Sequence, residues 1–186
     1  MGKERRTDFA SALTTSLVFI AILFLLLGAE RLFHLHLEQF GIVPRTERGL
    51  IGVAFAPLLH ANMKHLLANA VPLFVLLVVL LSNPAYHPYR TLAFVWIASG
   101  FGTWLIGRGN AVHIGASSII FGLAAFLILA GFLMSSWRSA IVAVLVFLFY
   151  GGIFYGVLPQ NGPISWEGHL SGALAGAWMA IVQRKK

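Results

Sequence analysis

The sequence predicts an all-α membrane protein, folded as one bundle of six hydrophobic helices. Of its 186 residues, 59% are hydrophobic and 10% are charged, a balance far from that of an ordinary soluble domain. Apolar stretches long enough to cross a bilayer, roughly 17–25 residues each, recur along the whole length. No repeat or change of composition divides the chain. We therefore expect a single domain over residues 1–186, with its core at about residues 10–182.

Each predicted span is a predominantly apolar run long enough to cross the membrane. The six spans cover residues 9–28, 60–81, 91–107, 117–134, 138–158 and 166–182. An even number of spans returns both ends of the chain to one side of the membrane. With both termini in the cytoplasm, most of the 13 Lys and Arg residues lie on the cytoplasmic side, as the positive-inside rule requires.

The longest connection, residues 30–59, mixes apolar and charged side chains. We expect it to lie in the membrane interface and to contain short helices. The chain has no cysteine, so covalent chemistry falls to Ser, Thr, Lys or a carboxylate. The net charge of +7 does not indicate nucleic-acid binding, because the basic residues lie mostly at chain ends and in short loops.

Ser117 opens the fourth predicted span, after the polar, glycine-containing segment GNAVHIGA. Polar residues at such positions are costly in a membrane and are therefore functional candidates. A serine at a helix start lies beside free N–H groups and the positive end of the helix dipole, which stabilise developing negative charge. Taken alone, the motif favours a helix cap beside a close-packing Gly115 over a nucleophile. Phe121, on the same helical face, can stack on an imidazole or simply pack in the core.

His169 lies near the start of the last span, in the segment WEGHLSGALAG. Gly172 and Gly176 follow on the same face, which allows another helix to come very close. If that helix is the one that Ser117 opens, the neutral imidazole can act as a general base. The alternative is a hydrogen bond to a backbone carbonyl across the interface. Glu167 faces another direction, so we expect it at the water interface and predict no Ser-His-acid triad.

The second span opens with HANMKHLLAN, in which His65 and Asn69 share one helical face. Both side chains carry N–H donors that can point at one oxygen, as an oxyanion hole requires, with the Ser117 N–H as a third donor. His60 precedes them. A metal site is the alternative for these histidines. Because there is no HExxH pattern and no cysteine, we expect neither a metal nor a cofactor.

In combination and in this order, HANMKHLLAN, GASSIIFG and GHLSGALAG resemble the motifs of the rhomboid family of intramembrane serine proteases. The resemblance covers essentially the six-span core. It implies that Ser117 is the nucleophile and His169 the general base, with an oxyanion hole of His65, Asn69 and the Ser117 N–H. It also implies supporting roles for four neighbouring residues: a hydrogen-bonding His60, Gly115, a Phe121 stacked on the catalytic histidine, and Gly172.

The same resemblance implies how such a protein works. The fifth span and the segment LPQNGPISWE would form a lateral gate and a cap for the substrate. The expected partners are transmembrane protein substrates and the lipid bilayer. The compact form is typical of a minimal bacterial member in the cytoplasmic membrane. The sequence departs from the family in two places: Ser118 stands where glycine is frequent, and a Trp-Arg pair in the first connection is missing.

Two other functions are compatible with a polytopic helical protein. A catalytically inactive rhomboid-like protein would bind transmembrane clients without cutting them, but here the nucleophile, the base and the oxyanion donors are all present. A small transporter would use the histidines as a proton relay. It would be expected to show an internal repeat or paired broken helices, and the sequence shows neither.

Overall fold

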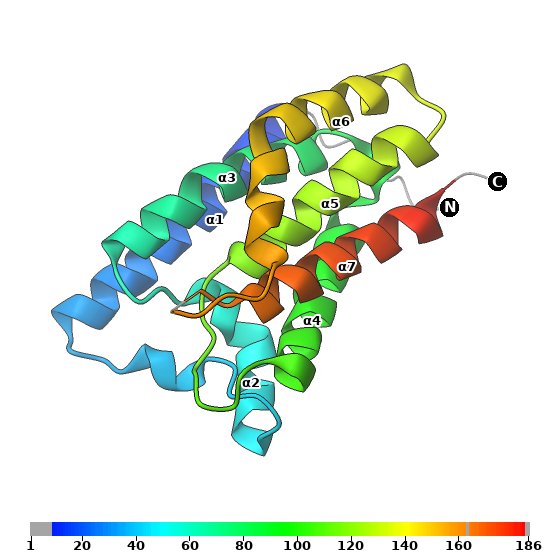
Figure 1. Ribbon diagram of the computed structural model, residues 1–186. Coiled ribbons are helices and arrows are strands. Elements are labelled where there is room, and N and C mark those ends of the chain that lie inside the picture. Colours follow the sequence, from blue (N-terminus) through cyan, green and yellow to red (C-terminus); the bar gives the residue numbers. More distant parts are fainter. Residues whose placement is uncertain (1–8, 163, 185–186) are drawn as a thin grey trace, which may run out of the picture.

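The computed structural model describes residues 9–162 and 164–184, which form a bundle of helices without β-strands (Figure 1). Extended pairing in these ranges is limited to an isolated bridge between Ile42 and His113. In chain order the helices are α1 (Phe9–Leu32), η1 (Leu37–Phe40), α2 (Glu47–Phe55), η2 (Ala56–Leu58), α3 (Met63–Leu81), η3 (Pro84–Tyr86), α4 (Pro88–Ile106), α5 (Ser117–Leu133), α6 (Trp137–Tyr150), η4 (Gly151–Val157) and α7 (Trp166–Gln183).

Every predicted span corresponds to a helical segment, with ends that differ by a few residues. The helix α1 continues to Leu32 instead of ending at 28. The helix α3 begins at Met63 rather than at 60, because the side chain of Asn62 caps it by accepting a 2.9 Å hydrogen bond from the His65 N–H. The fifth span is divided, since the α-helical part α6 ends at Tyr150 and the chain continues as the 3-10 helix η4.

Three segments of the described chain are long and apolar enough to cross a membrane: Phe9–Leu32, Met63–Leu81 and Trp137–Val157. The helix α5 is also apolar but has 17 residues. The helices α4 and α7 carry buried polar side chains, such as Thr103 and Ser171, which face the protein interior. The several apolar helices agree with an integral membrane bundle, and the number of six spans stays a prediction.

The helix α5 is the centre of the bundle, packed against α3, α4, α6 and α7. Its buried side chains include Leu123 and Phe126, and the ring of Phe126 meets that of Tyr86 edge-to-face with centroids 5.6 Å apart. Leu73 and Leu77 of α3 belong to the same core. Because lipid is as apolar as these side chains, close packing rather than removal of water holds the helices together.

Glycines bring the backbones of α5 and α7 into direct contact. A Cβ atom added at Gly172 would overlap the carbonyl oxygen of Ser118, and one at Gly176 would overlap the carbonyl oxygen of Gly122. A Cβ atom at Gly122 would itself lie 2.9 Å from the carbonyl oxygen of Gly172. The small-residue face predicted on the last span is thus the face that meets the helix that Ser117 opens.

Residues 30–59 lie at one end of the bundle, where the loops before α5 and α7 also lie (Figure 1). This connection contains η1, α2 and η2, in agreement with the expected short helices. The guanidinium of Arg45 donates to the carbonyl oxygens of Leu105 and Gly107 at 2.9 and 2.8 Å. The indole of Trp104 donates to the carbonyl oxygen of Thr46 at 2.8 Å. The connection is therefore fastened to the end of α4.

The contact between α5 and α7 predicts a strong size limit at Gly176. We expect Gly176→Leu to lower the free energy of unfolding by at least about 1–3 kcal/mol, because a well-packed contact has no room for added atoms. Thermal unfolding in detergent, followed by tryptophan fluorescence, measures this. Gly28→Leu is the control, because a Cβ atom at Gly28 would meet nothing within 4 Å. Equal stability of the two variants would contradict the contact.

Candidate functional site

Ser117 lies at the first position of α5, at the end of a loop that is fixed by its backbone. The N–H and carbonyl of His113 bond to the carbonyl and N–H of Ile42, both at 2.9 Å. The N–H of Gly115 donates to the carbonyl oxygen of Ala56 at 2.8 Å. Gly115 has φ +113, a conformation that favours glycine. Ser117 is therefore held at a defined place, beside the free N–H groups of the first helical turn.

His169 lies on α7 and points toward Ser117. Its Nε2 atom is 3.0 Å from the Oγ atom of Ser117. Both residues are half-buried. The glycine contact between α5 and α7 explains the distance, because the two side chains project from backbones that nearly touch. The structure thus brings together the two residues that the sequence predicted as nucleophile and base.

The other ring nitrogen of His169 is held by a backbone carbonyl. Its Nδ1 atom is 3.0 Å from the oxygen of Gly156, which lies in η4. A carbonyl can only accept, so Nδ1 carries the proton and Nε2 is left to accept the hydroxyl proton of Ser117. The ring of Phe121 stacks on the imidazole, with centroids 4.0 Å apart and planes at 10°. This is the tautomer and orientation that a general base needs.

The imidazole of His65 lies above the loop that leads to Ser117. A Cβ atom at Gly115 would be 2.7 Å from the Cε1 and Nε2 atoms of His65, so only glycine leaves room for the ring. Asn69 is buried, and its Nδ2 atom donates to the carbonyl oxygen of His65 at 2.8 Å. An amide has two N–H donors, so one remains available to a ligand. His65 thus lies beside the loop that leads to Ser117, and Asn69 lies about one helical turn further along α3.

His60 lies behind His65, with ring centroids 5.1 Å apart in an edge-on contact. Burial, together with the neighbouring His65, lowers the pKa of His60 to about 4, so its ring is neutral at physiological pH. Within the described ranges no side chain bonds to its ring nitrogens, and the backbone of Leu58 acts on the ring through a weak hydrogen bond. His60 also supports His65 by packing.

The hydroxyl of Ser118 is bonded to a neighbouring helix. Its Oγ atom accepts a 3.3 Å hydrogen bond from the Oγ atom of Ser99 on α4. The additional hydroxyl at this position therefore links α5 to α4.

Comparison with known proteins identifies the family. The model of the Rhomboid domain matches residues 47–186. The chain belongs to the rhomboid family. It is 44% identical over 178 residues to uncharacterized proteins of Mycobacterium tuberculosis and Mycobacterium bovis, which covers 91% of this chain and 74% of each relative. An uncharacterized protein of Mycobacterium leprae is 40% identical over 189 residues, covering 96% of this chain and 74% of the relative. The motifs of the second, fourth and sixth predicted spans lie in the matched region.

The prediction that Glu167 lies at the water interface is wrong, because this residue is buried in the rhomboid fold. Its side chain is 1% exposed, and its Oε1 atom pairs with the Nε atom of Arg108 at 2.8 Å. The same guanidinium donates to the carbonyl oxygens of Gly162 and Ile164 at 3.0 and 2.6 Å. Arg108 provides the charge that makes burial of the carboxylate tolerable. It also fastens the segment before α7, which is the predicted cap, to the loop before α5.

A second serine–histidine contact lies beside this ion pair. The Nδ1 atom of His113 is 2.6 Å from the Oγ atom of Ser165, and its Nε2 atom is 3.3 Å from the carbonyl oxygen of Arg108. Burial lowers the pKa of His113, which keeps the ring neutral. Ser165 also caps α7 by accepting from the N–H of Gly168 at 3.3 Å. The contact between His113 and Ser165 thus links the loop before Ser117 to the segment before α7, which contains His169.

The sequence analysis did not assign these positioning roles to Arg108, Gly156, His113 and Ser165. A role played by a backbone carbonyl, as at Gly156, leaves no side-chain pattern to detect. The buried ion pair did leave a signal, since an arginine and a glutamate border two helices that must pack closely. The sequence does not show that Arg108 and Glu167 are partners, because only the tertiary structure brings their two loops together.

The ion pair predicts strong coupling between Arg108 and Glu167. We expect Arg108→Met to lower the free energy of unfolding by about 3–5 kcal/mol, because it leaves a buried carboxylate without its partner. The double variant Arg108→Met/Glu167→Gln should regain part of that loss. Denaturant unfolding in detergent gives the double-mutant cycle. Arg48→Met, at an exposed site with one backbone hydrogen bond, serves as the control. Additive losses in the cycle would contradict the coupling.

Proposed function

We propose that this rhomboid is an intramembrane serine protease that hydrolyses peptide bonds in or next to transmembrane segments of other proteins. The observation that carries the proposal is the arrangement of His169, with Nε2 at 3.0 Å from Ser117 Oγ and Nδ1 at 3.0 Å from the Gly156 oxygen. It supports a Ser–His dyad in which a carbonyl takes the orienting place that a carboxylate has in a triad.

In the proposed reaction the Oγ atom of Ser117 attacks the carbonyl carbon of the scissile peptide bond while the Nε2 atom of His169 accepts its proton. Collapse of the tetrahedral intermediate breaks the C–N bond, and His169 gives the proton to the leaving amine. The product is an acyl-enzyme ester. A water molecule, deprotonated by His169, then attacks the ester, and the proton returns to Ser117 as the carboxylic acid product leaves.

The oxyanion formed in each step needs N–H hydrogen-bond donors beside Ser117, on the side opposite to His169. We assign this role to His65, Asn69 and the N–H of Ser117. The helix dipole of α5 acts in the same direction, since its positive end lies at Ser117. In a site that excludes most water, such donors stabilise the transition state strongly, and loss of one typically costs about 10²–10³ in rate.

The proposed lateral gate is α6 together with η4. Apart from Arg138 near its start, the side chains of α6 that point outward are apolar, among them Leu148 and Phe149, which are 70% and 78% exposed. The helix packs mainly against α5 and η4. Because η4 carries Gly156, outward movement of the gate removes the carbonyl that holds His169. We infer that a substrate can enter only while the dyad is incomplete, and that closure of η4 restores the base.

We place the protein in a bacterial cytoplasmic membrane as a single six-span domain, with both termini in the cytoplasm and the site near the outer surface. The start of α1 and the end of α7 lie at the same end of the bundle, opposite the site, which supports this orientation (Figure 1). The expected substrates are transmembrane proteins with glycine, proline or other weak helix formers near the cut, since their helices unwind at low cost.

The dyad predicts that Ser117→Ala and His169→Ala each lower cleavage of a single-span substrate in liposomes by at least about 10³-fold, because nucleophile and base act as a unit. Labelling by a fluorophosphonate probe should be lost in Ser117→Ala. Ser118→Ala is the matched control and should keep both cleavage and labelling, since its hydroxyl bonds to Ser99. Normal cleavage by folded Ser117→Ala, or no cleavage by the wild type across a broad substrate panel, would overturn the proposal.

The contact between the Gly156 carbonyl and His169 predicts that a substitution at Gly156 lowers kcat without changing KM. A Cβ atom there would lie 2.9 Å from Phe121 Cζ and 3.1 Å from His169 Nδ1, so Gly156→Ala should displace the imidazole. We expect kcat to fall at least about tenfold with KM nearly unchanged, because the lost interaction serves the transition state. Gly152→Ala is the control in the same short helix, with nothing within 4 Å of the new atom. Equal kcat values for the two variants would count against the positioning role.

A further inference from the structure

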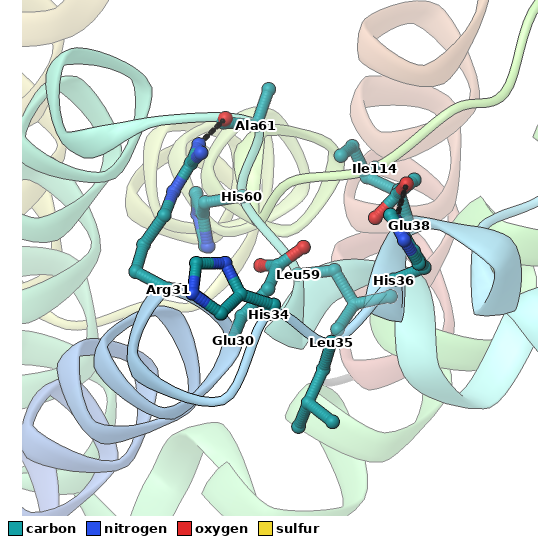
Figure 2. Close-up of a pocket in the computed structure, with 10 residues that line it drawn as sticks. All are labelled: Glu30, Arg31, His34, Leu35, His36, Glu38, Leu59, His60, Ala61 and Ile114. Carbon is teal, nitrogen blue, oxygen red and sulfur yellow. Dashed lines mark hydrogen bonds and ion pairs between the residues drawn. The ribbon is translucent and has the colours of Figure 1, made fainter.

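A large polar pocket lies next to the proposed oxyanion hole. Its volume is about 540 Å³. The walls come from the end of α1, the turn that follows it, η1 and the loop between η2 and α3 (Figure 2). Ile114, from the loop before Ser117, closes one side. None of the proposed chemical steps uses this pocket, yet its lining is rich in ionisable side chains.

Two carboxylates line the pocket, from different elements. Glu30 comes from the last turns of α1 and Glu38 from η1, and the two carboxyl groups interact with each other. The N–H of its own backbone holds the pKa of Glu38 below its usual range, so this group is ionised at neutral pH. The permanent positive charge of the lining is Arg31, which donates to the carbonyl oxygen of Ala61 at 2.7 Å. The two carboxyl groups thus act on each other through charge and through a side-chain hydrogen bond, in a pocket whose one arginine is Arg31.

His60 adds a buried group that lacks a side-chain partner. It lines the pocket and is 3% exposed, and within the described residues only the backbone of Leu58 acts on its ring through a weak hydrogen bond. Figure 2 shows its ring pointing into the space between Arg31 and Glu30. A neutral imidazole offers one acceptor nitrogen, and carboxylates offer acceptors only. Glu38 also pairs with His36 at 3.3 Å. The ring acceptor of His60 and the remaining lone pairs of the two carboxyl groups match a ligand with several N–H donors and a positive charge.

A metal ion does not fit the lining equally well. Among the described residues, no group of three or more His, Asp or Glu side chains converges closely enough to hold one ion. An ammonium or guanidinium group at the end of a long side chain does not require such convergence, because its donors diverge and can reach acceptors on different walls.

The pocket adjoins the proposed reaction centre. His60 packs against His65 at 5.1 Å, and Ile114 precedes Gly115, which lies beneath the His65 ring. An extended substrate advances about 3.3 Å per residue, so a residue a few positions from the cut reaches the pocket. We propose that this pocket binds a lysine or arginine side chain of the substrate near the scissile bond, between Glu30, Glu38 and His60. The proposal rests on the proposed protease function.

A substrate series tests the charge preference in the wild-type protein. Into one single-span substrate that the protein cleaves, Lys, Gln or Glu is placed in turn at each position within five residues of the cut. We expect one position at which Lys raises kcat/KM at least about tenfold over Gln and Glu lowers it. Equal values for the three residues at every position, with cleavage intact, would overturn the pocket assignment and leave the protease assignment standing.

Charge reversal then locates the effect. The double variant Glu30→Lys/Glu38→Lys should reverse the order, so that Glu at that position becomes the favoured residue, and recovery of cleavage with that substrate shows that the variant is folded. Glu47→Gln, at an exposed site on α2, is the control and should keep the wild-type preference. A preference for Lys that survives the reversal would overturn the assignment to this pocket. Cleavage of all substrates by Ser117→Ala would instead overturn the protease function.

Discussion

The contact between the backbones of α5 and α7 is the constraint on which the rest of the structure depends. Gly122, Gly172 and Gly176 leave no atoms between the two helices. In a membrane, where helices gain little from leaving lipid, such contact is a main source of attraction between them. It also sets the distance between Ser117 and His169, since each lies at the same end of its helix. Close packing of the two helices and the proposed chemistry therefore both require residues without a side chain at these positions.

Backbone carbonyls hold the polar side chains around the site. Gly156 accepts from His169, and His65 accepts from Asn69. A neutral carbonyl orients an imidazole without placing a second charge in an apolar surrounding, where an unpaired carboxylate is expensive. The buried Glu167 is paired with Arg108 instead, away from the dyad. The orientation of the His169 ring therefore depends on the position of η4, because the carbonyl that holds the ring belongs to that segment.

Several connections meet at one end of the bundle. Residues 30–59, the loop before α5 and the segment before α7 lie there together, joined by the Ile42–His113 bridge and the hydrogen bonds of Arg108. Irregular backbone at membrane depth requires protein or water around it. The clustering of these connections meets that requirement, and it places Ser117, His169 and the polar pocket at the same end of the bundle.

The sequence by itself determined the all-helical class, the approximate helices, and the identity of the side chains that meet around Ser117 and His169. It did so because apolar runs and helical spacing are local properties, and because three motifs occurred in the order of the rhomboid family. The tertiary structure decided which groups hold those side chains. Glu167 moved from an expected water interface to a buried ion pair, and Gly156 acquired a role through its carbonyl alone. These roles arise between residues far apart in the chain, and a backbone carbonyl is common to every residue, so only the fold distinguishes the one that faces His169.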